Sequence, residues 1–535
     1  MIKPEYSTCR YTKKACDTSA LSRVECRIPG SEISEILAVR AEVYPADCVC
    51  GEKQIAYGGR AVFSFVYADG DKRVCRAERG VEFSHRTPCE ETEGDCVCVP
   101  AYYADDVSYR REGSFIVAVA VIRANIVVYR EEEISYLSGG EELALKKQPV
   151  TFTRFSVSAT DGEENDEFET EYFTDLLLHS ETAYVKNVTC TDGTVNVEGE
   201  IVLNVCALKE DDTLVSYERL IPFAAAAPAP YFVDENWQTS GVEDDSTQNQ
   251  TQNQAQNQAQ NQAKNQSRQA QSEQAKFAAR ISISSANLSA ETSEERNKCA
   301  VRAEFKFNVR IFEYSPETLD FCTDAFSAKQ SVTLETRETS CRRLKFTKTY
   351  VKKIEGTAAL SAPIDYTASF LAAALPRAEA SVKAGKNGAF EIEGAANARV
   401  ILSDKDGLRA ADLTLPFVIA ETGEIAETDE IETQAIVCGI SLKQKKEGEA
   451  EAEATLKITL FVYETVPIRY VSKAEGGEEY GEETCAMSIF VPRGGDGLWE
   501  TAKALRKTPE ELTRTNPDLV FPLKGKERIL VYNRK

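Results

Sequence analysis

Histidine, tryptophan and methionine are scarce in this chain of 535 residues, which has two of each. A nucleophilic side chain needs a base held beside it, and His85 and His179 lie in different parts of the sequence. The glycine pairs at 58–59 and 494–495 lack the Gly-x-x-x-x-Gly-Lys-[Ser/Thr] spacing that cradles phosphates. We therefore expect no enzymatic activity, no catalytic residues and no cofactor.

Long hydrophobic runs are also missing. No stretch of 18 apolar residues occurs, and residues 1–20 contain no apolar core of signal-peptide length. The sequence therefore predicts a protein that does not span a membrane and stays in the cytosol, where its sixteen cysteines are expected to be reduced.

An excess of positive charge is absent as well. The net charge of −23 argues against nucleic acid as a partner, because the chain cannot replace the counterions around a phosphate backbone. Residues 487–535 carry a positive net charge, with ten Lys or Arg against six Asp or Glu, which leaves a net charge of about −27 on the remainder of the chain. This asymmetry indicates either an acidic partner for the tail or ordinary scattered surface charge.

No Cys-x-x-Cys motif occurs, although nine cysteines precede residue 100. Two Cys-x-Cys pairs, Cys48 with Cys50 and Cys96 with Cys98, would each place two thiols on one face of a strand. Four thiolates could hold zinc. The commoner alternative is that such cysteines are small buried apolar residues, so we assign no metal site, and cross-linking through these thiols also stays open.

Three stretches share one pattern of glycine, alternating strand, acidic turn, second strand and aromatic residue. The glycine and the closing phenylalanine are Gly59 and Phe83, Gly199 and Phe223, and Gly394 and Phe417. Period-two alternation joined by Asp/Gly turns is typical of β-hairpins. Each stretch is followed by an aromatic strand end, with Tyr129, Tyr314 and Tyr463 in matching positions. We expect these repeated aromatic residues to be core.

The fold class predicted is therefore mainly β, with three repeated β-sandwich or partly open barrel units and a small α+β module. A Gln/Asn-rich tract in the middle unit is expected to be a disordered loop, and residues 167–180 are expected to form a short amphipathic helix. The predicted division is an N-terminal segment (1–31), unit one (32–140), a connector (141–179), unit two (180–322) with an insertion at about 235–276, a connector (323–374), unit three (375–473), a linker (474–486) and the C-terminal module (487–535).

The C-terminal module reads as strand, helix, helix, strand. Leu498, Ala502 and Leu505 recur on one helix face. Thr508-Pro509 begins a second helix with a capping residue and a proline at the first helical position. Asn516-Pro517 ends that helix. We expect Trp499 to pack with Leu498 and Leu505 in the small core.

This module resembles the LysM domain, whose pattern is G-D-[ST]-L-W, two helices, N-P and a closing strand after glycine. The resemblance implies a shallow groove that binds a partner or a glycan, formed by Gly495, Asp496, Gly497, Leu498, Asn516, Pro517 and Asp518. Gly497 stands where the family has Thr or Ser, which removes a hydroxyl that could contact acetylated sugars. Beyond the turn, residues 519–521 are candidate apolar anchors, or else core, and Lys524, Lys526 and Arg528 form a basic rim.

Three β-rich repeats followed by one LysM module resemble the SPOCS-domain proteins of endospore-forming bacteria, in particular the SipL-like group of spore-coat morphogenetic proteins. The resemblance implies a non-enzymatic scaffold or adaptor of the spore envelope, located in the mother-cell cytosol at the forespore surface. It also implies a protein partner, the coat-basement ATPase known as stage IV sporulation protein A. The alternative is a cell-wall protein that binds peptidoglycan or chitin-like glycans.

Overall fold

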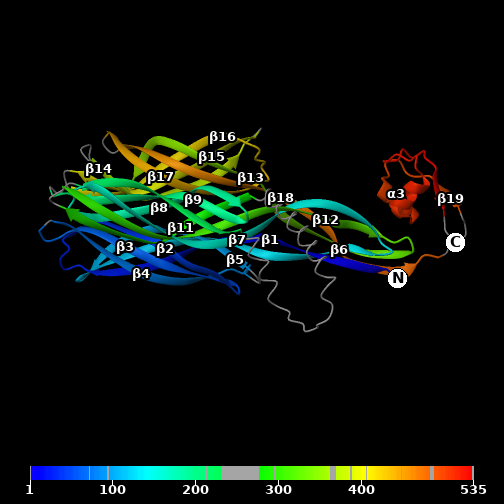
Figure 1. The fold of residues 1–535 in the computed structure, drawn as a ribbon, viewed down its shortest axis with the longest axis horizontal. Coiled ribbons are helices and arrows are strands. Elements are labelled where there is room, and N and C mark those ends of the chain that lie inside the picture. The colour runs from blue at the N-terminus through cyan, green and yellow to red at the C-terminus, as the bar shows by residue number, and fades with distance from the viewer. Residues whose placement is uncertain are drawn as a thin grey trace.

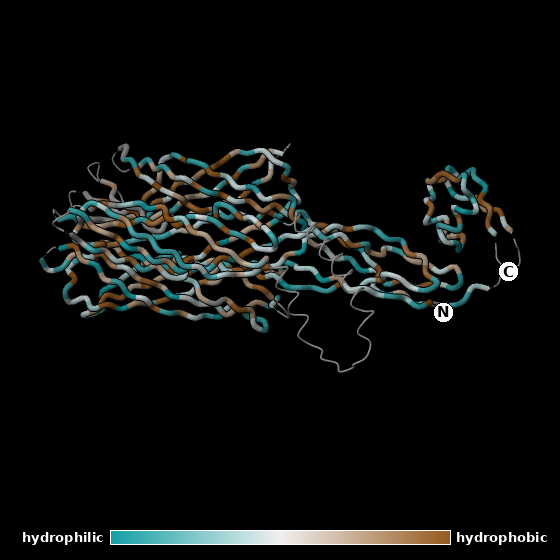
Figure 2. Tube along the Cα trace, in the orientation of Figure 1, coloured by the Kyte–Doolittle hydropathy of each residue, from teal (hydrophilic) through white to brown (hydrophobic). Residues whose placement is uncertain are grey.

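The computed structural model is mainly β, as the sequence predicts, and the two α-helices within the described residues lie in the C-terminal module. Residues are described throughout except at the following positions: 1, 72, 93–95, 211–213, 230–275, 294–296, 362–368, 386–387, 405–406, 447–448, 482–486 and 533–535. Hydrophobic and hydrophilic residues alternate along most strands (Figure 2), the period-two pattern of strands with one buried face.

Eighteen strands of the described residues form three units of the same topology, each with two three-stranded antiparallel layers. In unit 1 the layers have the orders β1-β6-β5 and β2-β3-β4. Its strands are β1 (Lys3–Pro29), β2 (Glu35–Gly51), β3 (Gln54–Ala68), β4 (Val74–Pro88), β5 (Cys96–Glu112) and β6 (Phe115–Glu141).

Units 2 and 3 repeat this order, with β7-β12-β11 and β8-β9-β10 in unit 2 and the matching layers in unit 3. In unit 3 the two layers also join where β13 meets β16, which makes it a partly open barrel. The strands are β7 (Ala144–Glu171), β8 (Asp175–Thr191), β9 (Thr194–Leu208), β10 (Leu214–Pro228), β11 (Lys276–Ser293), β12 (Lys298–Phe326), β13 (Gln330–Leu360), β14 (Ser369–Ala384), β15 (Ala389–Asp404), β16 (Gly407–Thr422), β17 (Glu430–Lys446) and β18 (Glu449–Glu479).

The segments expected to be an N-terminal segment and two connectors, 1–31, 141–179 and 323–374, contain the first long strand of each unit. β1 pairs with β6, β7 with β12 and β13 with β18, in each case along most of their length. Each unit therefore has six strands and begins upstream of the predicted boundary. The sequence pattern missed these strands because they lack the Gly-to-Phe signal of the hairpins.

The predicted helix at 167–180 is wrong, because this segment belongs to β7 and β8. Phe168 on β7, Leu176 on β8 and Tyr172 between the two strands all pack on the core of unit 2. The spacing of four therefore comes from two strands and the turn that joins them, in the two layers of the unit, and not from one helix face. The Gln/Asn-rich insertion lies between β10 and β11 and falls outside the described residues, apart from Lys276.

The repeated glycine and phenylalanine are direct cross-strand partners in all three units. Gly59 pairs with Phe83, Gly199 with Phe223 and Gly394 with Phe417. A Cβ at Gly199 would lie 2.2 Å from the Tyr184 carbonyl oxygen, and one at Gly394 would lie 1.9 Å from the Glu379 carbonyl oxygen. Only glycine fits this close backbone approach, and the phenylalanine ring covers the space that the missing side chain leaves.

The long strands of the three units extend beyond the sandwiches and pack together into a stalk (Figure 1). Tyr136, Phe321 and Tyr470, one from each unit, meet in one buried cluster. A second cluster contains Tyr129, Tyr314 and Tyr463. The aromatic residues predicted to be core are therefore core, and they join the units to one another.

Candidate functional site

The C-terminal module, described from 487 to 532, has the predicted strand–helix–helix–strand order. Its elements are β19 (Met487–Phe490), α3 (Leu498–Leu505), α4 (Pro509–Thr515) and β20 (Ile529–Tyr532). The Thr508 hydroxyl accepts a hydrogen bond from the backbone N–H of Glu511 at 3.2 Å, which confirms the predicted cap of α4. Gly497 precedes α3 and provides no side-chain cap.

The predicted site loop, Gly495 to Leu498, is tied to the segment before β20. Gly495 N–H donates to the Leu523 carbonyl oxygen at 2.7 Å, and Leu523 N–H donates to the Asp496 carbonyl oxygen at 2.9 Å. The Asp496 carboxylate accepts from the N–H of Arg493 at 3.2 Å. Gly495 has a φ of +98°, which only glycine adopts without strain. This loop holds the module together as well as facing solvent.

The second half of the predicted site, Asn516 to Asp518, has a structural residue at its start. The buried Asn516 side chain donates to the Leu530 carbonyl oxygen and accepts from its N–H, both at 2.8 Å. Asn516 thereby substitutes for a strand partner of β20. Pro517 and Asp518 are exposed. No hydrogen bond among the described residues joins this turn to the Gly495–Leu498 loop.

The module docks on the tip of the stalk through α3. Trp499 Nε1 donates to Asp324 Oδ2 at 2.8 Å, and its ring meets Phe326 edge-on at 5.1 Å between ring centres. Lys503 Nζ lies 2.7 Å from Asp324 Oδ1. Trp499 therefore packs at a core shared by the module and β12, rather than in the module alone.

Asp324 reaches the module because β12 is irregular at this point. The pairing of β12 with β7 shifts register between Cys322 and Asp324, and such an irregularity re-aims a side chain. Burial acts to raise the pKa of Asp324, but the Lys503 ammonium and the Trp499 N–H outweigh it and hold the pKa below its usual value. The carboxylate is thus ionised at neutral pH, where it accepts from both groups.

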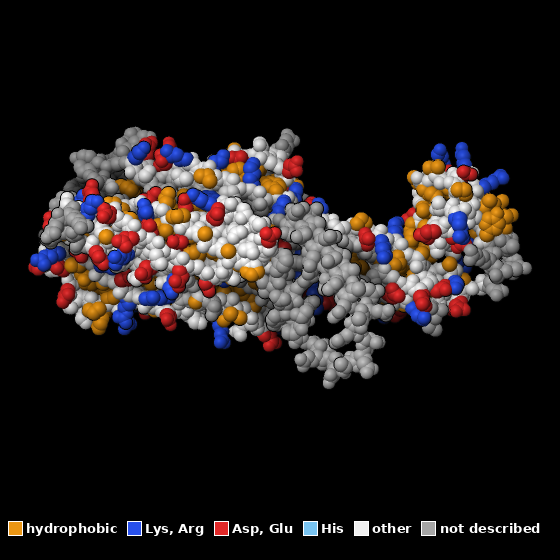
Figure 3. All heavy atoms as spheres, viewed as in Figure 1, with side chains coloured by type: hydrophobic (Ala, Val, Ile, Leu, Met, Phe, Trp, Pro, Cys, Tyr) orange, Lys and Arg blue, Asp and Glu red, His pale blue; other side chains and the backbone are white. Residues whose placement is uncertain are grey.

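The sheet of the module presents an apolar face to solvent. Its inner side, with Phe490, Ile529 and Val531, packs on the module core. The outer sheet face, defined here as Met487, Ile489, Val491 and Tyr532, has side chains that are 49–62 % exposed. Figure 3 shows hydrophobic side chains gathered at this outer edge of the module, with Lys and Arg side chains nearby. Sequence reasoning missed this face because only the register of β19 with β20 places these residues together.

The three residues proposed as anchors after the turn differ in their burial. Leu519 and Phe521 pack against the module core, whereas Val520 is 78 % exposed. Lys524, Lys526 and Arg528 are exposed, as the predicted basic rim requires. The module thus combines exposed apolar side chains with a basic margin.

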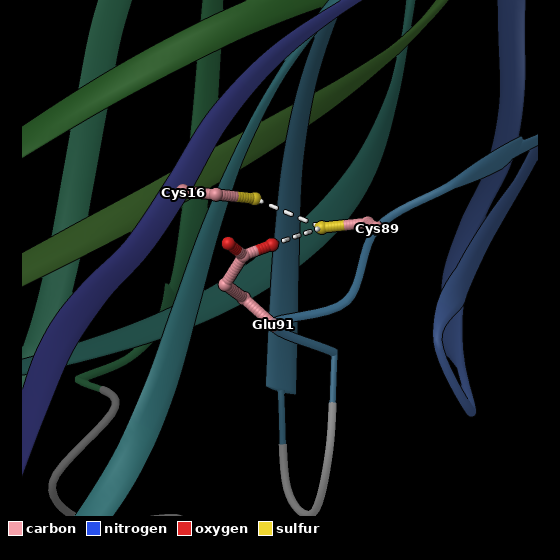
Figure 4. A group of neighbouring side chains, drawn as sticks. All are labelled: Cys16, Cys89 and Glu91. Carbon is pink, nitrogen blue, oxygen red and sulfur yellow. Dashed lines mark hydrogen bonds between the residues drawn. The ribbon is translucent and has the colours of Figure 1, made fainter.

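The cysteines of unit 1 form a separate group. A disulfide joins Cys50 on β2 to Cys98 on β5, so these two cysteines do not stay reduced, and the two Cys-x-Cys pairs cannot supply four free thiolates. Cys16 Sγ lies 3.0 Å from Cys89 Sγ, and the Cys89 thiol points to Glu91 Oε2 at 3.6 Å (Figure 4).

This group of Cys16, Cys89 and Glu91 has the donor types of a zinc site. Two thiolates on one tetrahedral zinc would lie about 3.8 Å apart, given Zn–S bonds of about 2.3 Å. The observed 3.0 Å is shorter, so the geometry fits a thiol pair near disulfide distance better than a metal centre.

A second titratable cluster lies where β2 of unit 1 meets β8 of unit 2. His179 Nδ1 is 3.2 Å from Glu181 Oε2, and Tyr44 donates to Glu181. Arg40 donates to Glu42 at 3.3 Å. These hydrogen bonds make the cluster a buried polar contact between units, although Arg40 Nε has no hydrogen-bond partner among the described residues. The sequence offers no signal for it, because its members come from two repeats.

His85, the other histidine, lies on β4 with its ring near Phe83 and Tyr57. Neither helix in the described part of the chain is long and apolar enough to cross a membrane. Comparison of the chain with protein-family models, with curated proteins and with solved structures found no match.

Proposed function

We propose that this protein is a non-enzymatic scaffold or adaptor of the spore envelope, whose C-terminal module binds a protein partner. The observation that carries the proposal is the outer sheet face, with Met487, Ile489, Val491 and Tyr532 half or more exposed on a module held at the end of the stalk. Exposed apolar residues ringed by polar ones are typical of protein–protein contacts.

The charge of the module indicates the character of the partner. Lys524, Lys526 and Arg528 are exposed on a module of net charge +4, whereas the rest of the chain carries about −27. A partner with an apolar patch and an acidic margin would complement this surface. On the resemblance to SPOCS-domain proteins that end in a LysM module, we propose the coat-basement ATPase, stage IV sporulation protein A, on the cytosolic side of the forespore surface.

Glycan binding is the second candidate, and one observation favours it. Gly495, Asp496 and Gly497 are at least partly accessible, as a sugar-binding loop requires. Two observations count against glycan binding. Gly497 has no hydroxyl, and the buried Asn516 side-chain amide already hydrogen-bonds the Leu530 backbone.

The two candidates differ in what the protein retains from a cell extract. A tagged full-length chain from sporulating cells is expected to retain the ATPase and to leave purified peptidoglycan unbound. Reversal of two rim charges, Lys524→Glu with Arg528→Glu, is expected to slow association with the ATPase and to weaken its salt dependence, since rim charges act mainly on encounter. Retention on peptidoglycan without any sporulation protein would refute the adaptor.

A further inference from the structure

A cavity of about 1450 Å³ lies between the three units. Its walls come from β1, β2, β5 and β6 of unit 1, from β7, β8, β11 and β12 of unit 2, and from β14, β15 and β17 of unit 3. Pockets for small molecules usually measure about 300–1,000 Å³, so this cavity has room for a metabolite-sized ligand.

Four arginines line the cavity, and they fall into two kinds. Arg123 Nη2 lies 2.6 Å from Asp105 Oδ2, and Arg377 Nη1 lies 3.8 Å from Asp105 Oδ1. Arg280 and Arg310 have no carboxylate within ion-pair distance in the part of the chain that the structure describes. In a protein of net charge −23, two such cations at one site need an explanation.

Arg280 and Arg310 are direct cross-strand partners on β11 and β12. Residues directly opposite in an antiparallel pair have Cβ atoms about 4.5–5.5 Å apart on the same face, and like charges there are destabilising. Each guanidinium is held in place: Arg280 stacks over Phe312 at 5.4 Å, and Arg310 donates to the Cys98 carbonyl oxygen at 3.4 Å. Burial, and then the Arg280 charge, lower the pKa of Arg310, which still leaves it protonated.

Two of the carboxylates that line the cavity have other partners. Asp161 accepts from the Asn308 amide at 3.0 Å, and Glu181 accepts from Tyr44. Beside Arg310, the buried Tyr102 hydroxyl faces the Cys48 thiol, which is its polar neighbour. Two fixed positive charges therefore converge on one part of the cavity.

We propose that Arg280 and Arg310 form a binding site for a phosphate or phosphomonoester group. Guanidinium groups match the oxygen geometry of phosphate and bind it with charge-assisted hydrogen bonds. A phosphomonoester carries about −1.5 to −2 at neutral pH, which balances the two arginines. The size of the cavity admits the rest of a phosphorylated metabolite as well as free phosphate.

The test uses the full chain and the variant Arg280→Gln/Arg310→Gln, with Arg123→Gln as the matched control that lines the same cavity but already has Asp105 as its partner. Thermal unfolding and isothermal titration calorimetry are run with inorganic phosphate, with a nucleoside monophosphate and with citrate, against chloride at equal ionic strength. Phosphate is expected to raise the Tm of the wild type and of Arg123→Gln. The double variant is expected to bind at least about tenfold more weakly, from the loss of charge-assisted bonds.

A second readout separates binding from a structural role. Without phosphate, the double variant is expected to be at least as stable as the wild type, because the like-charge contact is gone. Tighter binding of the nucleotide than of phosphate would identify a phosphorylated metabolite as the ligand, and equal binding would identify free phosphate. No phosphate-dependent shift in the wild type, an equal shift in the double variant, or preference for citrate would overturn the proposal. If the double variant does not fold, Arg280→Gln alone gives the same comparison.

Discussion

Trp499 Nε1 donates to Asp324 Oδ2 at 2.8 Å, and this contact joins the C-terminal module to the tip of the stalk. The same carboxylate receives Lys503 at 2.7 Å. Without this docking contact, a small module attached only by its linker would reorient freely, and its binding face would have no fixed orientation. This hydrogen bond gives the outer sheet face one orientation relative to the three units.

Loss of either partner should release the module without unfolding it. Trp499→Phe is expected to weaken docking by about 1–2 kcal/mol, because one charge-assisted hydrogen bond is lost while the ring packing on Phe326 is kept. Asp324→Asn is expected to weaken docking at least as much, because it also removes the ion pair with Lys503. Hydrogen exchange of α3 checks this, since released helices exchange faster.

The double variant supplies the control for this pair. If Asp324 and Trp499 act through one bond, the effects of the two substitutions are less than additive. Fully additive effects, or unchanged exchange in both single variants, would mean that docking does not depend on this contact.

Docking should also depend on pH. The pKa of Asp324 lies below its usual 3.8 in the docked state, so its contribution is present above that value and is lost as the pH falls through the docked pKa. In a Trp237→Phe background Trp499 is the only tryptophan. Its fluorescence is expected to stay constant from pH 7 to about 5 and to change only near and below pH 4. A transition near pH 6 would assign the effect to another group.

The aromatic cluster of the stalk should couple the three units in unfolding. Phe321 is fully buried between Tyr136 of unit 1, at 4.7 Å, and Tyr470 of unit 3, at 6.4 Å between ring centres. Phe321→Ala is expected to cost about 3–5 kcal/mol and to lower the melting of all three units together. Val351→Ala, at an exposed position, is the control. Loss of stability confined to unit 2 would contradict this coupling.

The Cys16–Cys89 pair should oxidise to a second bridge between the two layers of unit 1. With oxidised glutathione as oxidant, two thiols form one disulfide and two molecules of glutathione are released. Burial, and then the Cys89 thiol, raise the pKa of Cys16 to about 12, so the reaction is expected to be slow at pH 7 and faster as the pH rises. Peptide mass spectrometry without reduction detects the bridge, and Cys16→Ser must abolish it. The bridge is expected to add about 2–4 kcal/mol.

Particular residues show which parts of the fold can be predicted from the sequence. The Gly59–Phe83 spacing predicts a hairpin because the two residues meet across one turn, and local patterns of this kind are readable. β1, β7 and β13 were missed as parts of the units because their partners lie many residues away. The helix expected at 167–180 is wrong because its apolar residues lie on β7, on β8 and in the turn between them, an arrangement that their spacing does not distinguish from one helix face.

The features of the candidate site fall into the same two groups, those set by local sequence and those that depend on distant residues. The cap at Thr508 and the order of the C-terminal elements are local, and the sequence predicts them. The docking of Trp499 on Asp324, the outer sheet face and the Arg280–Arg310 pair all depend on residues that only the folded chain brings together. No periodicity in the sequence carries that information.

The most direct test of the adaptor is the affinity of the full chain for the coat-basement ATPase, measured by interferometry beside N-acetylglucosamine oligomers. The variant Ile489→Thr/Val491→Thr keeps β-branched side chains in place but makes the outer sheet face polar. We predict micromolar or tighter binding to the ATPase, at least tenfold weaker binding in the variant with an unchanged Tm, and no binding to the oligomers. Micromolar binding to the oligomers with none to the ATPase, or equal ATPase affinity in the variant, would contradict the account.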